Sequence, residues 1–143
     1  MSRIISGTCE PYYASIKRSN ADAYRGPGKQ YKVVCLYKCP SVPVIITAKY
    51  DHWRRIIDPD GEECWIHKNQ LSPKRSVMVI KKEGTGLFSA PKRDEHQIAH
   101  VKKNVIMSLI SVQNGWCKVE GRHGGNTYTG WIEAKHLFGV SDR

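Results

Sequence analysis

The residues of this chain best suited to covalent chemistry are Cys64 and His67, a thiol and an imidazole separated by two residues. A cysteine activated by a histidine is the nucleophile of many hydrolases. The intervening residues, Trp65 and Ile66, are typical of a β-strand, and in a strand side chains three positions apart point to opposite faces. The pair therefore does not predict a catalytic dyad, and we expect a protein that is not an enzyme.

The histidines that could ligate a metal are His96 and His100, which are separated by three residues and preceded by Asp94 and Glu95. On a helix this spacing would bring both imidazoles to one ion, but on a strand it places them on one face roughly 13 Å apart. We expect a strand here and predict no metal site. Glycine-rich nucleotide-binding loops of the two common types are absent from the sequence, so no cofactor is predicted.

The five cysteines of the chain cannot all pair within it, because their number is odd. No two of them form a Cys-x-x-Cys motif, and with the intervening stretch extended, the Cα atoms of Cys35 and Cys39 would lie roughly 13 Å apart, beyond disulfide reach. We therefore expect reduced or buried thiols. The cysteines are Cys9, Cys35, Cys39, Cys64 and Cys117.

Charge is the property of the whole chain that bears most on its partners. The sequence has 23 Lys and Arg against 13 Asp and Glu, a formal net charge of +10, dispersed over dipeptides such as Arg54-Arg55 and Lys102-Lys103. Such a pattern is typical of a solvated basic surface. It also fits a face that binds polyanions such as nucleic acid, anionic lipid headgroups or acidic cell-wall polymers.

The pattern of short apolar segments and turn residues predicts an all-β protein. These segments are rich in β-branched and aromatic residues and are bounded by Gly, Pro, Asn and Asp clusters. No window predicts a long amphipathic helix, although 69–71 and 134–137 could each form a single 3₁₀ turn. The predicted strands are 12–16, 31–37, 42–49, 53–57, 63–67, 76–80, 96–100, 105–112, 116–120 and 128–132.

An internal duplication determines how these strands are organised. A shift of 63 to 66 residues aligns Trp53 with Trp116 and Trp65 with Trp131, so one alignment places all four tryptophans. Paired tryptophans are much harder to obtain by chance than paired valines. The chain is therefore expected to consist of two similar modules.

The two copies are predicted to span 12–72 and 75–140, with a linker too short for free domain motion. They differ at the last hairpin, where the turn at 58–61 faces the longer stretch 121–127, which we expect to be a loop insertion at the hairpin tip. Modules of roughly 60 residues are marginally stable alone. We therefore expect the two to pack together.

Short motifs of aromatic, glycine and proline residues recur in both copies. They lie at 23–28, 42–44, 53–56 and 64–67 in the first copy and at 115–120 and 130–132 in the second, which has Ser89-Ala90-Pro91 in place of Arg25-Gly26-Pro27. With these motifs each copy resembles the bacterial SH3-like domain, and the pair resembles the tandem arrangement of small bacterial envelope-associated proteins. The resemblance implies two consecutive small SH3-like β-barrels packed together. Hydrolases of the NlpC/P60 type often carry such modules, but no residues are left here for their catalytic fold.

The tryptophans have two interpretations in such a barrel. A small closed barrel has room for few large side chains, so two tryptophans in each copy would provide most of its core or pack at its rim. The alternative, which the resemblance favours, is that they line a groove that contacts a ligand. The fold by itself does not decide the function, because it carries many.

The resemblance implies a non-enzymatic binding or scaffolding protein that recognises peptide, protein or cell-wall ligands such as peptidoglycan. In such barrels a loop and a hairpin tip border one shallow groove, and the first copy is the better candidate because it keeps the Arg-Gly-Pro turn. Tyrosine and tryptophan would supply flat apolar contact, and arginines would bind carboxylates or phosphates. The alternative is a basic β-barrel that binds nucleic acid or another polyanion. The candidate ligand-binding residues are Tyr24, Arg25, Tyr31, Trp53, Arg54 and Trp65.

Two features conflict over the cell compartment. The resemblance implies the cell envelope or periplasm, whereas five cysteines and the lack of a hydrophobic leader stretch in 1–9 favour a reducing compartment such as the cytoplasm. No run of 18 apolar residues predicts a transmembrane span. We expect the envelope.

Overall fold

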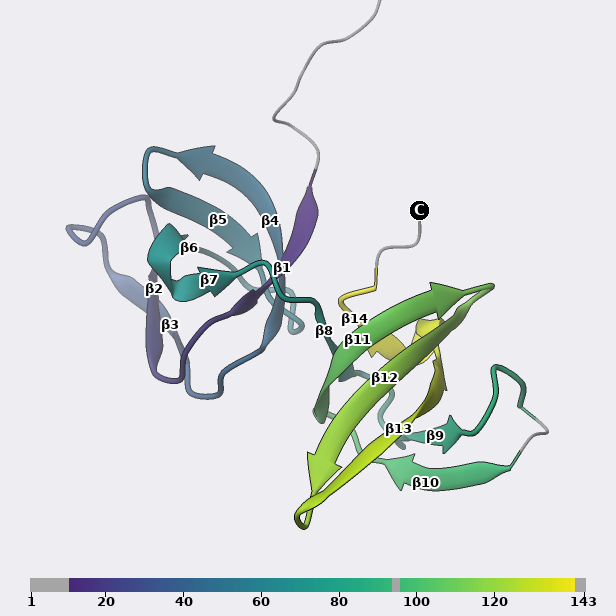
Figure 1. The fold of residues 1–143 in the computed structure, drawn as a ribbon. Helices are drawn as coiled ribbons and strands as arrows, with labels where there is room; N and C mark the ends of the chain where they lie inside the picture. Colours follow the sequence, from purple (N-terminus) through teal and green to yellow (C-terminus); the bar gives the residue numbers. More distant parts are fainter. Residues whose placement is uncertain (1–10, 94–95, 141–143) are drawn as a thin grey trace, which may run out of the picture.

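The computed structural model describes residues 11–93 and 96–140. Two separate seven-stranded antiparallel sheets make up most of it, which confirms the prediction of an all-β chain with two consecutive SH3-like barrels. Figure 1 shows the two bodies side by side, joined by a short stretch of chain. Within the described residues no helix is long and apolar enough to cross a membrane.

The first domain contains strands β1 to β7, arranged in the order β3-β2-β6-β5-β4-β1-β7. A single 3₁₀ turn, η1 (Lys68–Gln70), separates β6 from β7, and the ring of His67 caps it by accepting a hydrogen bond from the backbone N–H of Asn69. The strands are β1 (Tyr12–Ile16), β2 (Ala21–Tyr24), β3 (Val33–Tyr37), β4 (Pro43–Tyr50), β5 (Trp53–Ile57), β6 (Glu63–His67) and β7 (Leu71–Ser72).

The second domain repeats this arrangement with the strand order β10-β9-β13-β12-β11-β8-β14. Its 3₁₀ turn, η2 (Ala134–His136), again stands before the last short strand. The strands are β8 (Ser76–Val79), β9 (Thr85–Phe88), β10 (Gln97–Val101), β11 (Ile106–Gln113), β12 (Trp116–His123), β13 (Asn126–Glu133) and β14 (Leu137–Phe138).

Strand alternation builds a separate core in each domain. In the first domain Ile56, Cys64 and Ile66 point inward from β5 and β6 and are fully buried. Trp53 and Trp65 alternate with them and are only half-buried, so the expectation that tryptophans provide most of the core is wrong. Branched aliphatic side chains fill a small barrel without burying an indole N–H that needs a partner.

Besides the two-residue strands β7 and β14, strands β2 and β9 have no counterpart among the predicted strands. Their sequences, Ala-Asp-Ala-Tyr and Thr-Gly-Leu-Phe, contain residues with low β-propensity. Ala21, Ala23 and Leu87 are nevertheless completely buried. Small residues at the barrel interior let the neighbouring strands approach closely, and this tertiary packing outweighs the local preference.

The expected loop at 121–127 is instead an extension of two strands. Strand β12 continues to His123 and β13 begins at Asn126, so only Gly124 and Gly125 form the turn. Both glycines have positive φ, 61° and 81°, as a two-residue type I′ turn requires. The prediction was wrong because Gly121, Gly124 and Gly125 together suggest a loop, although Gly121 lies within the strand.

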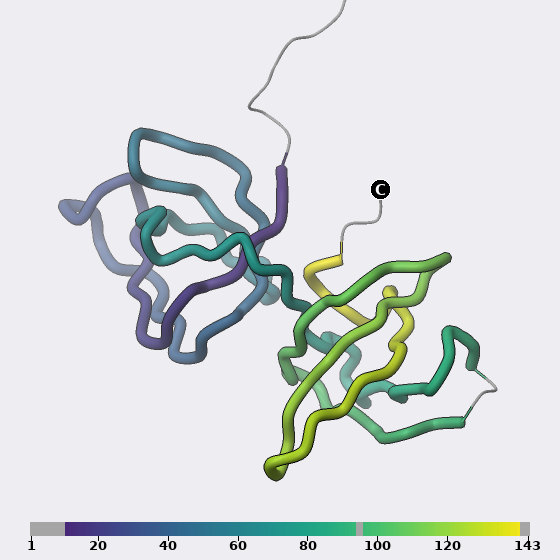
Figure 2. Tube along the Cα trace, in the orientation of Figure 1, coloured from purple at the N-terminus to yellow at the C-terminus, as the bar shows by residue number. Residues whose placement is uncertain are grey.

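The two domains contact one another directly beside the linker, which Figure 2 shows as the single passage of the chain between them. The hydroxyl of Ser15 donates to the carbonyl of Lys74 at 2.8 Å, and that of Ser76 donates to the carbonyl of Ser41 at 2.6 Å. The rings of Tyr13 and Phe138 meet edge to face at 6.3 Å. Two small barrels therefore share a polar and aromatic contact.

Candidate binding site

An aromatic cluster lies on the outer face of the first domain. The rings of Tyr24 and Trp53 are 5.5 Å apart at an interplanar angle of 90°, and those of Trp53 and His67 are 5.3 Å apart at 77°. Trp53 and His67 are directly paired across β5 and β6, and Tyr24 is paired with Trp65 across β2 and β6. All four side chains are half-buried, so their rings are fixed by packing while part of their surface faces solvent.

Arg55, which the sequence did not single out, joins this cluster. It is paired with Trp65, and its guanidinium lies 5.9 Å from the centre of the indole ring. Its Nε donates to the hydroxyl of Thr47 at 3.0 Å and lies 3.4 Å from a carboxylate oxygen of Glu63. The signal that could have found it is strand alternation, which places Trp53 and Arg55 on one face.

Arg54 is not brought to the aromatic face by its strand. It is paired with the buried Ile66, and its Nη1 donates to the backbone carbonyls of Asp51 at 2.9 Å and Trp53 at 3.0 Å. The guanidinium therefore stabilises the β4–β5 turn by bonding to two of its backbone carbonyls. Its charge still acts on the cluster, because it contributes to the lowered pKa of His67.

Tyr31 and Arg25 lie in the loop between β2 and β3. The ring of Tyr31 lies so close to Gly26 that a Cβ there would be 2.6 Å from it, so the glycine is needed for this stacking. The loop is closed by a hydrogen bond from the backbone N–H of Arg25 to the carbonyl of Lys32 at 2.8 Å. Both side chains are exposed and are available to a ligand that reaches this loop.

The electrostatic environment of the cluster is basic. The pKa of His67 is lowered, first by burial and then by the positive charges of His52, Lys29, Lys68 and Arg54. The imidazole rings of His52 and His67 are 6.0 Å apart. Because Nδ1 of His67 accepts the backbone N–H of Asn69 at 3.0 Å, the neutral ring carries its proton on Nε2. This face therefore presents hydrogen-bond donors and positive charge.

The second domain repeats the aromatic part of the cluster. Phe88 and Trp116 are 5.8 Å apart at an angle of 89°, and Trp131 is paired with Phe88. Trp53 and Trp116 thus have equivalent aromatic partners, as the duplication predicts. The tryptophans of both domains lie where their rings pack against a neighbour and retain a solvent-facing edge.

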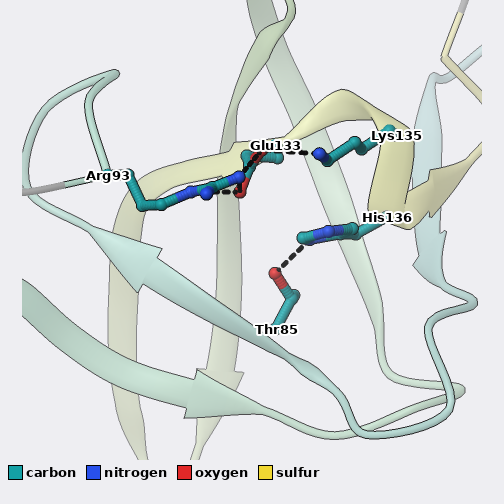
Figure 3. A network of polar contacts seen from close by, with 5 residues as sticks. All are labelled: Thr85, Arg93, Glu133, Lys135 and His136. Carbon is teal, nitrogen blue, oxygen red and sulfur yellow. Dashed lines mark hydrogen bonds and ion pairs between the residues drawn. The ribbon is translucent and has the colours of Figure 1, made fainter.

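Glu133 occupies in the second domain the position that His67 has in the first. It is paired with Trp116, as His67 is paired with Trp53. The guanidinium of Arg93 holds its carboxylate through contacts of 2.9 to 3.2 Å, and Nζ of Lys135 lies 3.5 Å away (Figure 3). The hydrogen bonds from Arg93 lower the pKa of Glu133. Beside it, the hydroxyl of Thr85 and Nδ1 of His136 are 2.7 Å apart. This face of the second domain therefore carries its own carboxylate.

The cysteine and histidines with the chemistry for catalysis or metal binding lie apart from one another in the structure. Cys64 is buried, whereas His67 is half-buried on the outer face of the same strand. His100 lies on β10, with its Nε2 2.9 Å from the carbonyl oxygen of Glu83. Cys9, Asp94 and Glu95 lie outside the described residues. Within the described ranges no group of three or more His, Cys, Asp and Glu side chains is arranged to hold a metal ion.

Comparison with known proteins identifies the fold family. Residues 17–73 and again residues 81–139 match the bacterial SH3 domain. Curated protein sequences give no significant match to the chain. Among solved structures, NlpC2 from Trichomonas vaginalis is 19% identical with a TM-score of 0.38, covering 90% of this chain and 48% of that one. NlpC1 from Trichomonas vaginalis is 18% identical with a TM-score of 0.39, covering 96% and 50%.

The chain spans about half the length of these two structures. At such low structural similarity they do not bear on its function, whereas the two matches to the family together cover most of the chain. The repeat of sheet order, of 3₁₀ turns and of the edge-to-face aromatic pair agrees with that match. The chain belongs to the bacterial SH3 domain family and contains two consecutive domains of it.

Proposed function

We propose that this chain is a non-enzymatic binding protein of the bacterial cell envelope, whose first domain recognises a peptide, protein or cell-wall fragment that carries an anionic group. The observation that carries the proposal is the cluster of Tyr24, Trp53 and His67, three rings packed edge to face in a basic environment. Such rings are already ordered before a ligand arrives, so little side-chain entropy is lost when it binds.

The internal comparison between domains supports an anionic ligand. In the second domain the place of His67 is taken by Glu133, which the loop residue Arg93 holds. In the first domain burial and the positive charges of His52 and the loop residue Lys29 instead lower the pKa of His67. Glu63 lies beside Arg55 in the first domain, but no carboxylate stands at the position of His67, and a ligand would supply one there. Peptides of bacterial cell walls carry free carboxylates.

The buried thiols argue for binding rather than catalysis. Burial raises the pKa of the Cys64 thiol to about 12 and that of Cys117 to about 11. At neutral pH both are therefore protonated, and the thiol is a far weaker nucleophile than the thiolate. The hydroxyl of Tyr37 lies 3.1 Å from the sulfur of Cys64, and Cys64 is buried, so packing encloses the thiol.

The matched pair Trp53 and Trp116 allows a sharp test of the proposed site. Titration of the full chain with a soluble muropeptide, followed by backbone amide shifts, should locate binding at the first domain. Trp53→Phe should weaken binding about tenfold, since central aromatic anchors typically contribute more than 1 kcal/mol, whereas Trp116→Phe should leave it unchanged. Arg25→Ala should also weaken binding. Equal effects of the two tryptophan substitutions in folded protein would contradict the assignment.

The alternative function, binding of nucleic acid or another polyanion, is favoured by the net charge of +10. It predicts a different behaviour, because affinity for a polyanion falls steeply with salt and would be shared by basic groups on both domains. A titration with a short single-stranded RNA at 50 mM and 200 mM salt distinguishes the two. A loss of affinity larger than a hundredfold, unaffected by Trp53→Phe, would favour the polyanion function.

A further inference from the structure

A cavity of about 520 Å³ lies in the second domain between strand β10 and the long β12–β13 hairpin. Figure 1 shows this strand and the tip of the hairpin at the same end of the domain. Much of the wall is apolar, from both exposed and buried side chains. The principal apolar lining residues are Leu87, Ile98, Val101, Val105, Met107 and Tyr128.

The first domain fills the corresponding space with Tyr37. This residue is paired with Ala21 as Val101 is paired with Thr85, so Tyr37 and Val101 occupy equivalent positions. The hydroxyl of Tyr37 is buried, donates to the carboxylate of Asp58 at 3.0 Å and closes the end of the barrel. In the second domain the smaller Val101 stands at this position and lines the cavity.

The partner of that hydroxyl is also missing from the second domain. Asp58 follows Trp53 by five residues, and Gly121 follows Trp116 by the same interval. From this point β12 and β13 extend beyond the length of β5 and β6, and the extension contributes Arg122 to the wall of the cavity. The hollow thus lies where the second domain has a smaller side chain and a longer hairpin than the first.

The charge around the cavity is basic. Lys102, Arg122 and His123 lie among its lining residues, and no acidic side chain does so within the described part of the chain. His100 also lines it, with its Nε2 2.9 Å from the carbonyl oxygen of Glu83. An apolar hollow with a cationic rim is complementary to a ligand that combines a bulky apolar side chain with carboxylates.

The neighbouring strand edge favours an extended ligand. Strand β10 is the terminal strand of its sheet and is paired only with β9. Its outer edge therefore offers backbone N–H and carbonyl groups to an added strand, and addition of a strand to a sheet edge is a common mode of peptide recognition. A peptide lying along β10 would pass beside the cavity with every second side chain directed to the same face.

We propose that this cavity is a second binding site, which accepts an extended acidic peptide with an apolar side chain in the hollow and its backbone beside β10. The site is separate from the aromatic cluster of the first domain, and it stands whether or not that cluster binds a ligand.

The test uses the full chain, labelled with ¹⁵N, and three acetylated and amidated hexapeptides. The first alternates Glu and Leu, the second has Lys in place of Glu, and the third has Ser in place of Leu. The Glu-Leu peptide should shift the amide signals of 97–101 and 121–128. The other two should bind at least tenfold more weakly, because one loses charge complementarity and the other loses the apolar side chain.

Substitutions within the chain separate the cavity from its surroundings. Val101→Tyr, which introduces the side chain found at Tyr37, should weaken binding of the Glu-Leu peptide at least tenfold, whereas Val112→Tyr on the exposed part of β11 should not change it. Lys102→Glu should weaken it severalfold, whereas Lys82→Glu, outside the lining, should not. If Val101→Tyr unfolds the domain, the pair of lysine variants decides, because both side chains are exposed.

The proposal is overturned if millimolar Glu-Leu peptide leaves the signals of 97–101 and 121–128 unchanged, or if all three peptides bind equally well. It is also overturned if these signals shift with protein concentration alone, because the cavity would then be covered by a second copy of the chain. The proposal is likewise overturned if folded Val101→Tyr and Lys102→Glu both still bind the Glu-Leu peptide as tightly as the parent chain.

Discussion

Tyr37, Asp58 and Cys64 form a buried polar cluster that closes the first barrel. One oxygen of Asp58 accepts the hydroxyl of Tyr37 at 3.0 Å, and the other accepts the backbone N–H groups of Asp60 and Glu62, both at 2.9 Å. A single carboxylate therefore connects the interior of the barrel with the β5–β6 turn. Burial is also the main reason that the pKa of Tyr37 is strongly raised.

Removing the hydroxyl of Tyr37 should destabilise the first domain. Tyr37→Phe leaves one oxygen of the buried Asp58 without its partner, and such a loss costs roughly 1–3 kcal/mol. Urea unfolding of the full chain measures the change, with Tyr50→Phe, on a side chain that is 63% exposed, as the matched control. A loss of less than 0.3 kcal/mol, or an equal loss in the control, would show that the hydrogen bond contributes nothing.

The thiol of Cys64 should make stability depend on alkaline pH. Its pKa is raised from 9.0 to about 12 by burial, so the folded chain retains a proton that the unfolded chain releases. The stability from this group is fully present below pH 9 and is lost as the pH rises toward 12. Cys64→Ala should reduce the slope of unfolding free energy between pH 9 and 10.5 by up to about 1.4 kcal/mol per pH unit.

Chemical denaturation at several pH values provides the measurement for Cys64. Cys39→Ala is the control, because that thiol is exposed and free, and it should leave the slope of the parent chain unchanged. Identical slopes for Cys64→Ala and the parent would contradict the argument that burial holds the proton.

The aromatic cluster shows which site residues the sequence could predict. Tyr24, Trp53 and Trp65 are brought together because they lie on strands that pair directly. Arg54 was selected for its type, and alternation along β5 instead places Arg55 beside Trp65. The role of His67 depends on the pairing of β5 with β6 and on the loop that carries Lys29, and neither can be read from local sequence.

At the scale of elements, strands rich in branched and aromatic residues were predictable, whereas the short inner strands β2 and β9 were not. The segments β1, β5 and β6 have the predicted bounds because branched and aromatic residues alternate between two faces. Strand β2 depends on buried alanines, whose value lies in close packing within the barrel. Strands 116–120 and 128–132 are predicted, but the stretch 121–127, expected to be a loop, extends both strands up to a turn of two residues.

The β12–β13 turn gives a pair of opposite predictions. Gly125 has φ of 81°, and Gly125→Ala should cost about 1 kcal/mol because an L-residue is strained in this region. Gly124 has φ of 61°, where asparagine is tolerated, and Gly124→Asn creates the Asn-Gly sequence that type I′ turns prefer. Thermal unfolding should therefore show a loss for the first variant and no loss for the second. Equal losses would exclude a type I′ turn.

At the scale of the whole molecule, the two domains are connected by a few specific contacts rather than by a shared core. Each hydrophobic cluster belongs to one sheet, apart from Ile106 of the second domain, which packs against the core of the first. A cavity of about 220 Å³ lies between the domains and is bordered by Arg75 and Arg122. The duplication predicted two packed barrels, but the polar character of their contact depends on serine hydroxyls and backbone carbonyls that no sequence pattern indicates.

Arg75 is the side chain most directly involved in holding the domains together. Its guanidinium lies 5.0 Å from the centre of the Tyr13 ring in the first domain, while its Nη2 donates to the carbonyl of Gly139 in the second at 2.6 Å. Arg75→Ala removes both contacts and leaves each core intact. We therefore expect the variant to fold but to lose the fixed relation between its domains.

Amide ¹⁵N relaxation measures this relation, because two domains that tumble as one body have the same rotational correlation time. In the parent chain the values for 12–72 and 76–138 should agree, whereas in Arg75→Ala both should fall and differ from one another. Arg93→Ala is the matched control, since it removes an exposed arginine that pairs with Glu133 within the second domain. Equal and unchanged correlation times in Arg75→Ala would show that the serine hydrogen bonds and the Tyr13–Phe138 contact suffice to hold the domains.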